Sequence, residues 1–315
     1  MSTEIKPELF NSFQVAKSFQ KGNSFYTDIS FHHSGEYLVA TDSDDSIRMY
    51  DCVQGTERKV VYSKKYGASH IRYTHAKKAI LHASTKVDDT IRYLSLHDNS
   101  YLMYFKGHQS RVTGIAMSPV EDLFISSSKE SIRLYDLGYP NAVGFLPLPP
   151  NTFNPIVAFD PSGLVFAVGL NNRTISLYDL KKIEQGPFHS FDVYDRLVPG
   201  AEWISLEFSP DGRHILISSR NSVLFIVDSY DYILKSRLTA HVNSNKHDMI
   251  GCYSPDGRYV LNGSENGKIF IWDAESTEVV NTLDAHMKLV RKVQFNPRYA
   301  MIASIADDLV FIIPE

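Results

Sequence analysis

The chain has 315 residues, of which 43% are hydrophobic and 22% are charged, and these values are typical of a globular protein with a sizeable core. Its net charge of −4 gives no overall basic field, which argues against direct binding of nucleic acid or of a membrane surface. Neither a membrane-length apolar run nor a signal-peptide core is found, and Cys52 and Cys252 form no disulfide framework or metal cluster, so we expect a soluble protein of a reducing compartment, cytoplasm or nucleus.

The first predicted element is a strand near the N-terminus. The segment FQVAKSF (13–19) alternates, with Phe13, Val15 and Phe19 on one face, whereas residues 1–11 are expected to form a flexible tail. The sequence ends at Glu315, directly after the third strand of the last repeat unit described below, so that unit lacks an outer strand. Because a free sheet edge invites aggregation, we predict that residues 12–20 supply the missing strand.

A turn between two apolar strands recurs along the chain. It reads FHHSGEYLVA (31–40) at first and FSPDGRHILI (208–217) or YSPDGRYVLN (253–262) further on, with Pro, Asp and Gly in positions that favour a tight turn. The fifth residue of each occurrence falls at 35, 77, 121, 163, 212, 257 and 299, so the intervals are 42, 44, 42, 49, 45 and 42 residues. This regular period predicts seven repeats of one structural unit.

Each unit continues into a further strand that is apolar on both faces. These strands read SIRMYD (46–51), TIRYLS (90–95), SIRLYD (131–136), TISLYD (174–179), SVLFIVD (222–228), KIFIWD (268–273) and LVFIIPE (309–315). A small sheet of this kind must be covered on both sides, and a ring of sheets does this. We therefore predict an all-β fold, a seven-bladed β-propeller forming a single domain over residues 1–315, with the last blade closed by the N-terminal strand.

The second unit departs from the others at the end of this strand, where Leu94-Ser95 replaces an aromatic residue and Asp. Leu94 can still fill the space between blades. Ser95 offers a shorter polar group at the turn, and we expect Asp98 to take over part of the hydrogen bonding. The segment is thus predicted to be a diverged blade.

The units resemble WD repeats. The resemblance is carried by residues with a structural role in such repeats, namely Asp51, His108, Asp136, Asp179, His241, Trp272, Asp273 and His286. In that family a His, a Ser or Thr, a turn Asp and the Trp form a hydrogen-bonded tetrad. Unit six comes closest to the full set, with His241, Ser264, Asn266 and Trp272, whereas Lys129 stands at the turn position of unit three. WD repeats are specific for the propeller and say little about function.

A closer resemblance extends over essentially the whole chain. The segments SKKYG, RYTHA and DDTIRYLSLHDN within 61–108, together with YDLKKIEQGPF (178–188), look like one WD-repeat subunit. That subunit is shared by COMPASS-type histone lysine-4 methyltransferase complexes and the cleavage-and-polyadenylation or termination machinery, where it lies with a type-1 protein phosphatase and its nuclear targeting subunit. The resemblance implies a nuclear, non-catalytic protein whose partner is a methyltransferase subunit, a phosphatase-targeting subunit or both.

Motifs that would indicate catalysis are not found in the sequence, which has no nucleophile elbow, phosphate-binding Gly-rich loop, HExxH or CxxC pair. We predict no enzyme activity, no cofactor and no metal site. The run RKVQF (291–295) imitates a short docking motif for type-1 phosphatase, but it falls on the first strand of unit seven, where Val293 and Phe295 should face the core. We therefore expect any contact with a phosphatase to come through a partner.

The candidate partner site lies on the face formed by the connections between blades and the turns between second and third strands. It contains the cations and aromatic residues that binding hot spots favour, namely Lys64, Lys65, Tyr66, Arg111, Phe153 and Trp203. Acidic residues in the same loops make a solvated rim the competing interpretation, and the strand WISLEF (203–208) leaves the direction of its Trp open. PLPP (147–150) and the loop DVYDRLVPGAE (192–202) are alternative sites.

Three functions are compared on this basis. The first hypothesis is a scaffold that binds an extended segment of a larger nuclear subunit. The second is a reader of a histone tail or modified peptide, which needs an aromatic cage or acidic pocket, and no clustering of aromatic residues in the loops is evident. The third, a propeller enzyme, lacks every catalytic arrangement sought.

Overall fold

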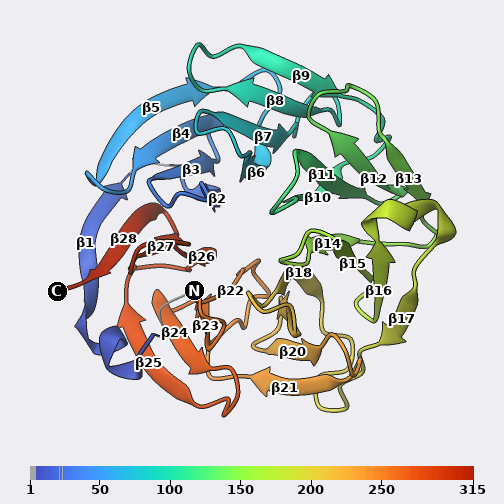
Figure 1. The fold of residues 1–315 in the computed structure, drawn as a ribbon. Coiled ribbons are helices and arrows are strands. Elements are labelled where there is room, and N and C mark those ends of the chain that lie inside the picture. The colour runs from blue at the N-terminus through green and yellow to red at the C-terminus, as the bar shows by residue number, and fades with distance from the viewer. Residues whose placement is uncertain (1–4, 21, 23) are drawn as a thin grey trace.

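The computed structural model describes residues 5–20, 22 and 24–315, and the strands of these residues form a closed ring of seven sheets (Figure 1). Each sheet has four antiparallel strands, arranged from the centre of the disc to its rim. The predicted all-β, seven-bladed propeller is therefore confirmed. Within the described ranges, no helix is long and apolar enough to cross a membrane.

The strands follow one order in every blade. The inner strands are β2 (Tyr26–Phe31), β6 (Ser69–Tyr73), β10 (Val112–Met117), β14 (Ile156–Phe159), β18 (Trp203–Phe208), β22 (Cys252–Tyr253) and β26 (Lys292–Phe295). The second strands are β3 (Tyr37–Asp42), β7 (Ala79–Ala83), β11 (Leu123–Ser128), β15 (Val165–Leu170), β19 (His214–Ser219), β23 (Tyr259–Gly263) and β27 (Ile302–Ile305). The third strands are β4 (Ser46–Asp51), β8 (Ile91–Ser95), β12 (Ser131–Asp136), β16 (Thr174–Asp179), β20 (Leu224–Asp228), β24 (Lys268–Asp273) and β28 (Asp308–Pro314). The outer strands are β5 (Thr56–Tyr62), β9 (Tyr101–Phe105), β13 (Gly144–Pro147), β17 (His189–Asp192), β21 (Leu234–Leu238), β25 (Val279–Asp284) and β1 (Phe13–Gln20).

The turns between inner and second strands have the geometry that their Pro, Asp and Gly residues predict. Gly212 and Gly257 have φ of +74° and +75°, a left-handed conformation that glycine adopts without steric cost. The Ser209 hydroxyl donates to the Asp211 carboxylate at 2.5 Å, and the Gly212 N–H donates to the Ser209 carbonyl at 2.8 Å. These local contacts fix where each hairpin reverses and therefore the register of its two strands.

The aspartates that end the third strands cap the turns that follow. The Asp51 carboxylate accepts the backbone N–H of Gln54 at 2.8 Å, while Asp136, Asp179 and Asp273 each accept the backbone N–H two residues further on. A carboxylate in this position satisfies a turn N–H that has no strand partner. These four aspartates therefore stabilise the turns between the third and outer strands of their blades.

Blade two caps the same turn with two shorter groups. The His97 N–H donates to the Ser95 hydroxyl at 3.3 Å, and Asp98 accepts the backbone N–H and the hydroxyl of Ser100 at 3.4 and 2.9 Å. Leu94 is buried in the core between blades one and two. Both predictions for this diverged blade are confirmed.

A buried histidine ties the loops of blade three together. The His108 Nε2 lies 2.7 Å from the Ser126 hydroxyl and its Nδ1 lies 2.6 Å from the Ser128 hydroxyl. Glu130, one residue beyond the expected Lys129, supplies the turn carboxylate and accepts the Gln109 N–H at 2.8 Å. In blade seven His286 makes the same kind of contact, 2.5 Å from Asp308 and 2.7 Å from Ser304.

Blade six differs from the sequence prediction of a nearly complete tetrad. The Trp272 Nε1 donates to the backbone carbonyl of Thr239 at 2.7 Å, and the His241 ring packs edge-on against the indole with centroids 5.7 Å apart. The Ser264 hydroxyl accepts the backbone N–H of Val242 at 3.0 Å. The four side chains are therefore present in blade six without the chain of hydrogen bonds that their identities suggested.

The two terminal strands complete the seventh blade, as predicted. β1 pairs antiparallel with β28, from Phe13 opposite Pro314 to Gln20 opposite Asp308. A β-bulge between Val15 and Lys17 interrupts the alternation of β1. Because of this shift, Phe19 packs against the core between blades seven and one, whereas Phe13 lies in the core of blades six and seven. The prediction that Phe13, Val15 and Phe19 share one face is therefore wrong for Phe19, and Val15 is 41% exposed.

The residues before β1 differ from the flexible tail expected over 1–11. Residues 1–4 lie outside the described residues, but η1 (Pro7–Ser12) is an ordered 3-10 helix. Its Phe10 is fully buried and packs edge-on against Tyr259 of blade six, with ring centroids 4.8 Å apart. The Ile5 N–H also donates to Asp256 at 2.8 Å. The N-terminal segment therefore bridges blades six and seven. Sequence analysis missed this because it considered the alternation of residues 13–19 only, and Phe10 lies before that segment.

Candidate partner-binding site

The predicted partner residues lie mostly on one face of the disc, which we call the upper face. It carries the connections between blades and the turns between second and third strands. Lys64 and Lys65 lie between β5 and β6, and Arg111 lies between β9 and β10; all three are exposed and form no ion pair among the described residues. Phe153, between β13 and β14, is 51% exposed. The structure thus leaves these four side chains accessible to a partner.

Tyr66 lies beside these lysines, but one face of its ring is already occupied. The Arg92 guanidinium lies 3.7 Å from the Tyr66 ring centre and within 6.0 Å of the rings of Tyr101 and Tyr104. Arg92 is buried and its two terminal nitrogens each lie 2.9 Å from an oxygen of Asp88. Sequence analysis missed this aromatic cluster because its members come from a loop and from outer strand β9. Since the chain's own Arg fills the cluster, it has no space for a methylated lysine of another protein.

Trp203 is not part of the accessible surface, which corrects its prediction as a partner residue. Its side chain is 3% exposed and lies in the core between blades four and five. A β-bulge between Trp203 and Ser205 inverts the alternation of β18, so that Trp203 shares the core face with Leu206 while Ile204 lines the central channel.

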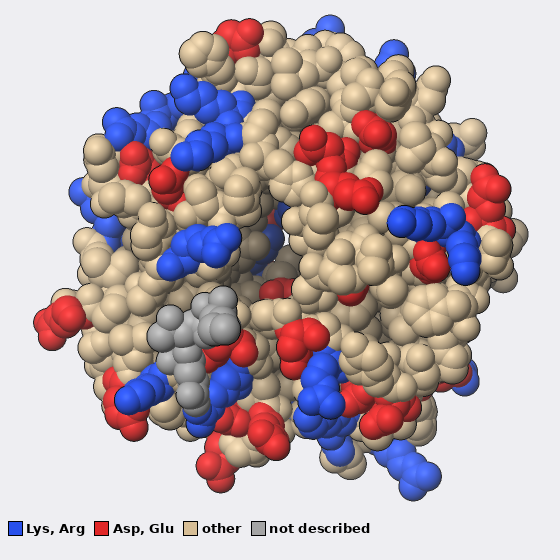
Figure 2. Space-filling view, in the orientation of Figure 1, with Lys and Arg blue, Asp and Glu red and all other residues tan. Residues whose placement is uncertain are grey.

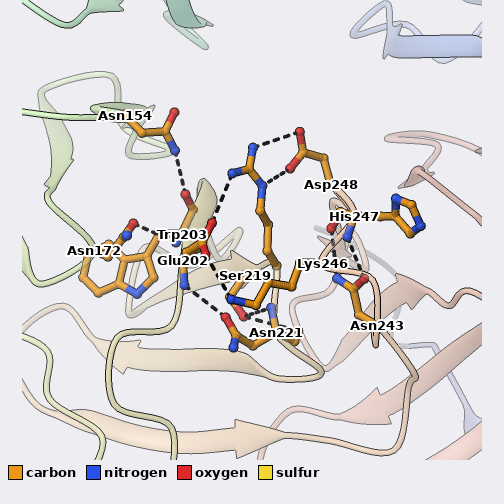
Figure 3. A network of polar contacts seen from close by, with 11 residues as sticks. Asn154, Asn172, Glu202, Trp203, Ser219, Asn221, Asn243, Lys246, His247 and Asp248 are labelled. Carbon is orange, nitrogen blue, oxygen red and sulfur yellow. Dashed lines mark hydrogen bonds and ion pairs between the residues drawn. The ribbon is translucent and has the colours of Figure 1, made fainter.

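Asparagine side chains hold the backbone around Trp203 in place (Figure 3). Asn154 donates to the Trp203 carbonyl at 2.8 Å, and Asn172 accepts the Trp203 N–H at 2.8 Å. Asn221 accepts the N–H of Glu202 at 3.1 Å. Side chains from blades four and five thus hold the backbone of Glu202 and Trp203, where the connecting loop enters β18.

A charged network next to these asparagines was not predicted from the sequence. Arg220 donates from Nε to Asp248 at 2.6 Å and lies 3.2 Å from Glu202, which also lies 3.3 Å from the Lys246 ammonium (Figure 3). The hydrogen bond to Asp248 raises the pKa of Arg220 despite the opposing effect of burial. The four residues of the network come from three separate segments of the chain, so no local sequence motif indicates it. Two cations and two anions balance here, which leaves the group without net charge.

The central channel of the ring contains a second cluster, which is buried. The Asp28 carboxylate of β2 lies 2.6 Å from the Lys292 ammonium of β26 and 3.0 Å from the Arg72 guanidinium of β6. Burial by itself raises the pKa of Asp28. The two cations outweigh this effect and lower the pKa to about 2. The cluster therefore joins blades seven, one and two across the closure of the ring. The channel around it has a volume of about 690 Å³ and opens at the centre of the disc in Figure 2.

The strand that supplies Lys292 carries the RKVQF run. Val293 is fully buried in the core of blades six and seven, and Phe295 is 9% exposed in the same core. The interpretation of this run as a core strand is confirmed. A phosphatase therefore cannot dock on these two side chains while the blade is folded.

Glu207 lines the same channel from β18 and carries an unusual pKa. Burial raises it from an ordinary value of 4.5 to about 7, although the Tyr253 N–H, Lys292 and Arg72 oppose this. Between pH 4.5 and 7 the folded state keeps a proton that the unfolded chain has lost. Raising the pH through this window therefore lowers the free energy of unfolding.

We expect Glu207→Gln to remove this pH dependence. The variant should match the wild type at pH 5 and exceed its free energy of unfolding at pH 8 by up to about 3 kcal/mol. Urea unfolding at the two pH values measures the difference, with Glu121→Gln, on an exposed side chain, as the matched control. Equal pH slopes for Glu207→Gln and the wild type would contradict the assignment.

Comparison with known proteins identifies the repeats and the family. The model of the WD domain, G-beta repeat family matches residues 14–51, 99–136 and 233–273. WD repeat-containing protein 82 of Drosophila melanogaster is 41% identical over 316 residues, which cover 100% of this chain and 98% of that protein. The chain belongs to this WD-repeat family.

Two further relatives connect the family with named complexes. The Set1 complex component swd2 of Schizosaccharomyces pombe is 37% identical over 252 residues, covering 78% of this chain and 69% of the relative. COMPASS component SWD2 of Saccharomyces cerevisiae is 38% identical over 231 residues, covering 71% and 68%. The resemblance drawn from the second and fourth units is therefore confirmed at the level of the family.

Proposed function

We propose that this chain is a non-catalytic adaptor subunit of a nuclear Set1/COMPASS-type histone lysine-4 methyltransferase complex. The observation that carries the proposal is its 37% and 38% identity to two proteins that are named as components of the Set1 complex and of COMPASS. A closed ring of seven blades supplies a stiff surface for docking. The adaptor binds an extended segment of a larger subunit, and no cofactor takes part.

The upper face around blades two and three is the proposed site for that segment. The acidic residues that argued for a neutral rim are largely engaged within the chain, since Asp45 pairs with Lys86 and Asp88 pairs with Arg92. The cations that remain exposed without an ion pair among the described residues are Lys64, Lys65, Lys106, Arg111 and Lys129. The patch therefore favours an acidic peptide, with Phe153 and the open side of Tyr66 as apolar contacts.

Charge reversal on this patch tests the site. Lys64→Glu combined with Arg111→Glu should reduce recovery of the methyltransferase subunit with the tagged chain by at least about tenfold. The two substitutions replace positive charges, which attract an acidic partner, by negative charges, which repel it. Quantitative mass spectrometry of affinity-purified complexes measures recovery. Lys17→Glu combined with Lys78→Glu, on exposed side chains away from the patch, is the control and should change recovery little.

The same purification tests the wider proposal. Recovery of Set1-type methyltransferase subunits with the unmodified chain supports it, and recovery of a type-1 phosphatase with its targeting subunit and 3′-end factors would add the second assembly that the sequence resemblance implies. Recovery of neither set from nuclear extract would reject the proposed function. Equal recovery with the Lys64 and Arg111 variant would reject only the patch.

A further inference from the structure

The connection between β16 and β17 is the most elaborate on the lower face, the face opposite the proposed patch. It spans residues 180–188, and it begins with the 3-10 helix η2 (Leu180–Gln185). Leu180 and Ile183 anchor η2 in the core between blades three and four. Unit four also has the longest repeat interval, 49 residues, to which this connection and the loop between β17 and β18 both contribute.

A groove of about 590 Å³ lies between this connection and the turn that leads into β15. Its walls are Leu164 and Phe188, and each of these side chains is 55% exposed. Backbone hydrogen bonds hold both walls, from Leu180 N–H to the Leu164 carbonyl and from Phe188 N–H to the Leu177 carbonyl, both at 2.9 Å. The volume is within the range of small-ligand sites, and hydrogen bonds hold the backbone at both walls.

The apolar surface continues from the groove onto blade three. A Cβ placed on Gly163 would lie 3.3 Å from the Val120 side chain, so the turns of blades three and four are in contact here. Val120 itself is 63% exposed. Exposed apolar side chains that lie together in this way indicate an interaction surface, whereas single ones do not.

Two lysines give the groove its charge. Lys181 and Lys182 line it, are exposed, and form no ion pair among the described residues. The Asp179 carboxylate, also in the lining, accepts the Lys181 backbone N–H at 2.9 Å. On the right of Figure 2, over the place of β14–β17 in Figure 1, Lys and Arg atoms lie beside Asp and Glu atoms at the border of a broad uncharged surface.

We propose that this groove binds a protein segment in which acidic residues flank a large apolar side chain. The apolar side chain lies between Leu164 and Phe188, and the carboxylates pair with Lys181 and Lys182. The inference goes beyond the proposed function because it adds a second site on the opposite face. One disc can then hold segments of two subunits at the same time.

Fluorescence anisotropy with a labelled peptide Glu-Glu-Leu-Phe-Glu-Glu tests the groove on the full chain. We expect Phe188→Ala, and separately Lys181→Glu with Lys182→Glu, to raise the dissociation constant of the peptide at least tenfold. A peptide with Gly-Ser in place of Leu-Phe, and one with Lys in place of Glu, should bind at least tenfold more weakly. Because all three substituted side chains are exposed, the variants should keep the thermal stability of the wild type.

The variant Lys64→Glu with Arg111→Glu separates this site from the upper patch. We expect it to bind the peptide within twofold of the wild type. Loss of binding in this variant would place the peptide on the upper patch and overturn the groove. Full affinity in the groove variants, or no measurable binding of the peptide at millimolar protein, would also overturn it, and neither result bears on recovery of methyltransferase subunits through the patch.

Discussion

Deletion of residues 12–20 is expected to lower the thermal stability of the propeller strongly and to make the protein prone to aggregation. The deletion removes β1, which covers the edge of β28 along its whole length. Phe13 and Phe19 also leave the two cores on either side of blade seven. Burial of each Phe is worth about 3–5 kcal/mol, so the melting temperature should fall by more than about 15 °C. The exposed edge of β28 would then pair with strands of other molecules.

Circular dichroism melts and size-exclusion chromatography measure both effects. Lys17→Ala is the control within the same strand, because Lys17 is exposed and its backbone pairing with Phe311 does not depend on its side chain. The control should melt within about 2 °C of the wild type. If the deletion variant melted like the wild type and stayed monomeric, β1 would not be the element that closes the ring.

Asp28→Ala is expected to give the largest destabilisation of any single substitution in the channel. The change leaves the Lys292 ammonium, which is 2.6 Å from Asp28, buried without its counterion, and removes a contact of Arg72 at 3.0 Å. Breaking a buried ion pair from one side costs about 3–5 kcal/mol. Because the pKa of Asp28 is held near 2, this carboxylate is charged throughout the range from pH 5 to pH 8, and the destabilisation should be present at both pH values. Urea unfolding measures the change in the free energy of unfolding.

A second variant distinguishes lost charge balance from lost packing. Asp28→Leu combined with Lys292→Met replaces the pair by apolar groups and should recover at least half of the lost free energy, since the buried ammonium is removed together with its counterion and only the part-exposed Arg72 guanidinium loses a partner. Glu36→Ala removes one side of the exposed pair with Lys77 and should change stability little, because water screens that pair. A double variant as unstable as Asp28→Ala would show that the charges themselves are not the cause.

The fold could be predicted because its information is local and repeated. Turn residues such as Asp211 and Gly212 specify each hairpin within a few positions, and the period of the turns fixes the number of blades. The closing strand followed from counting strands in the last unit. The same local chemistry placed Ser95 and Asp98 correctly in the diverged blade.

The site was only partly predictable, because its details depend on shifts of one residue and on contacts distant in sequence. The bulge in β18 moved Trp203 into the core, and alternation alone gives no sign of such a bulge. In blade three the turn carboxylate comes from Glu130, one residue beyond the position that the repeat pattern gave to Lys129. The ion pair of Asp28 and Lys292 joins residues 264 positions apart, and nothing local to either segment indicates it.

The pairing of β1 with β28 also determines when folding can finish. Ser18 and Asp308, which are hydrogen-bonded across these strands, are 290 positions apart. Such a distant contact forms slowly, since the entropy of the long intervening chain must be lost before the contact stabilises anything. On the ribosome, β1 emerges before β28 and cannot pair until β28 has been made. The nascent chain therefore exposes an unpaired strand while the segment between β1 and β28 is being made, and a chaperone has most to protect during that interval.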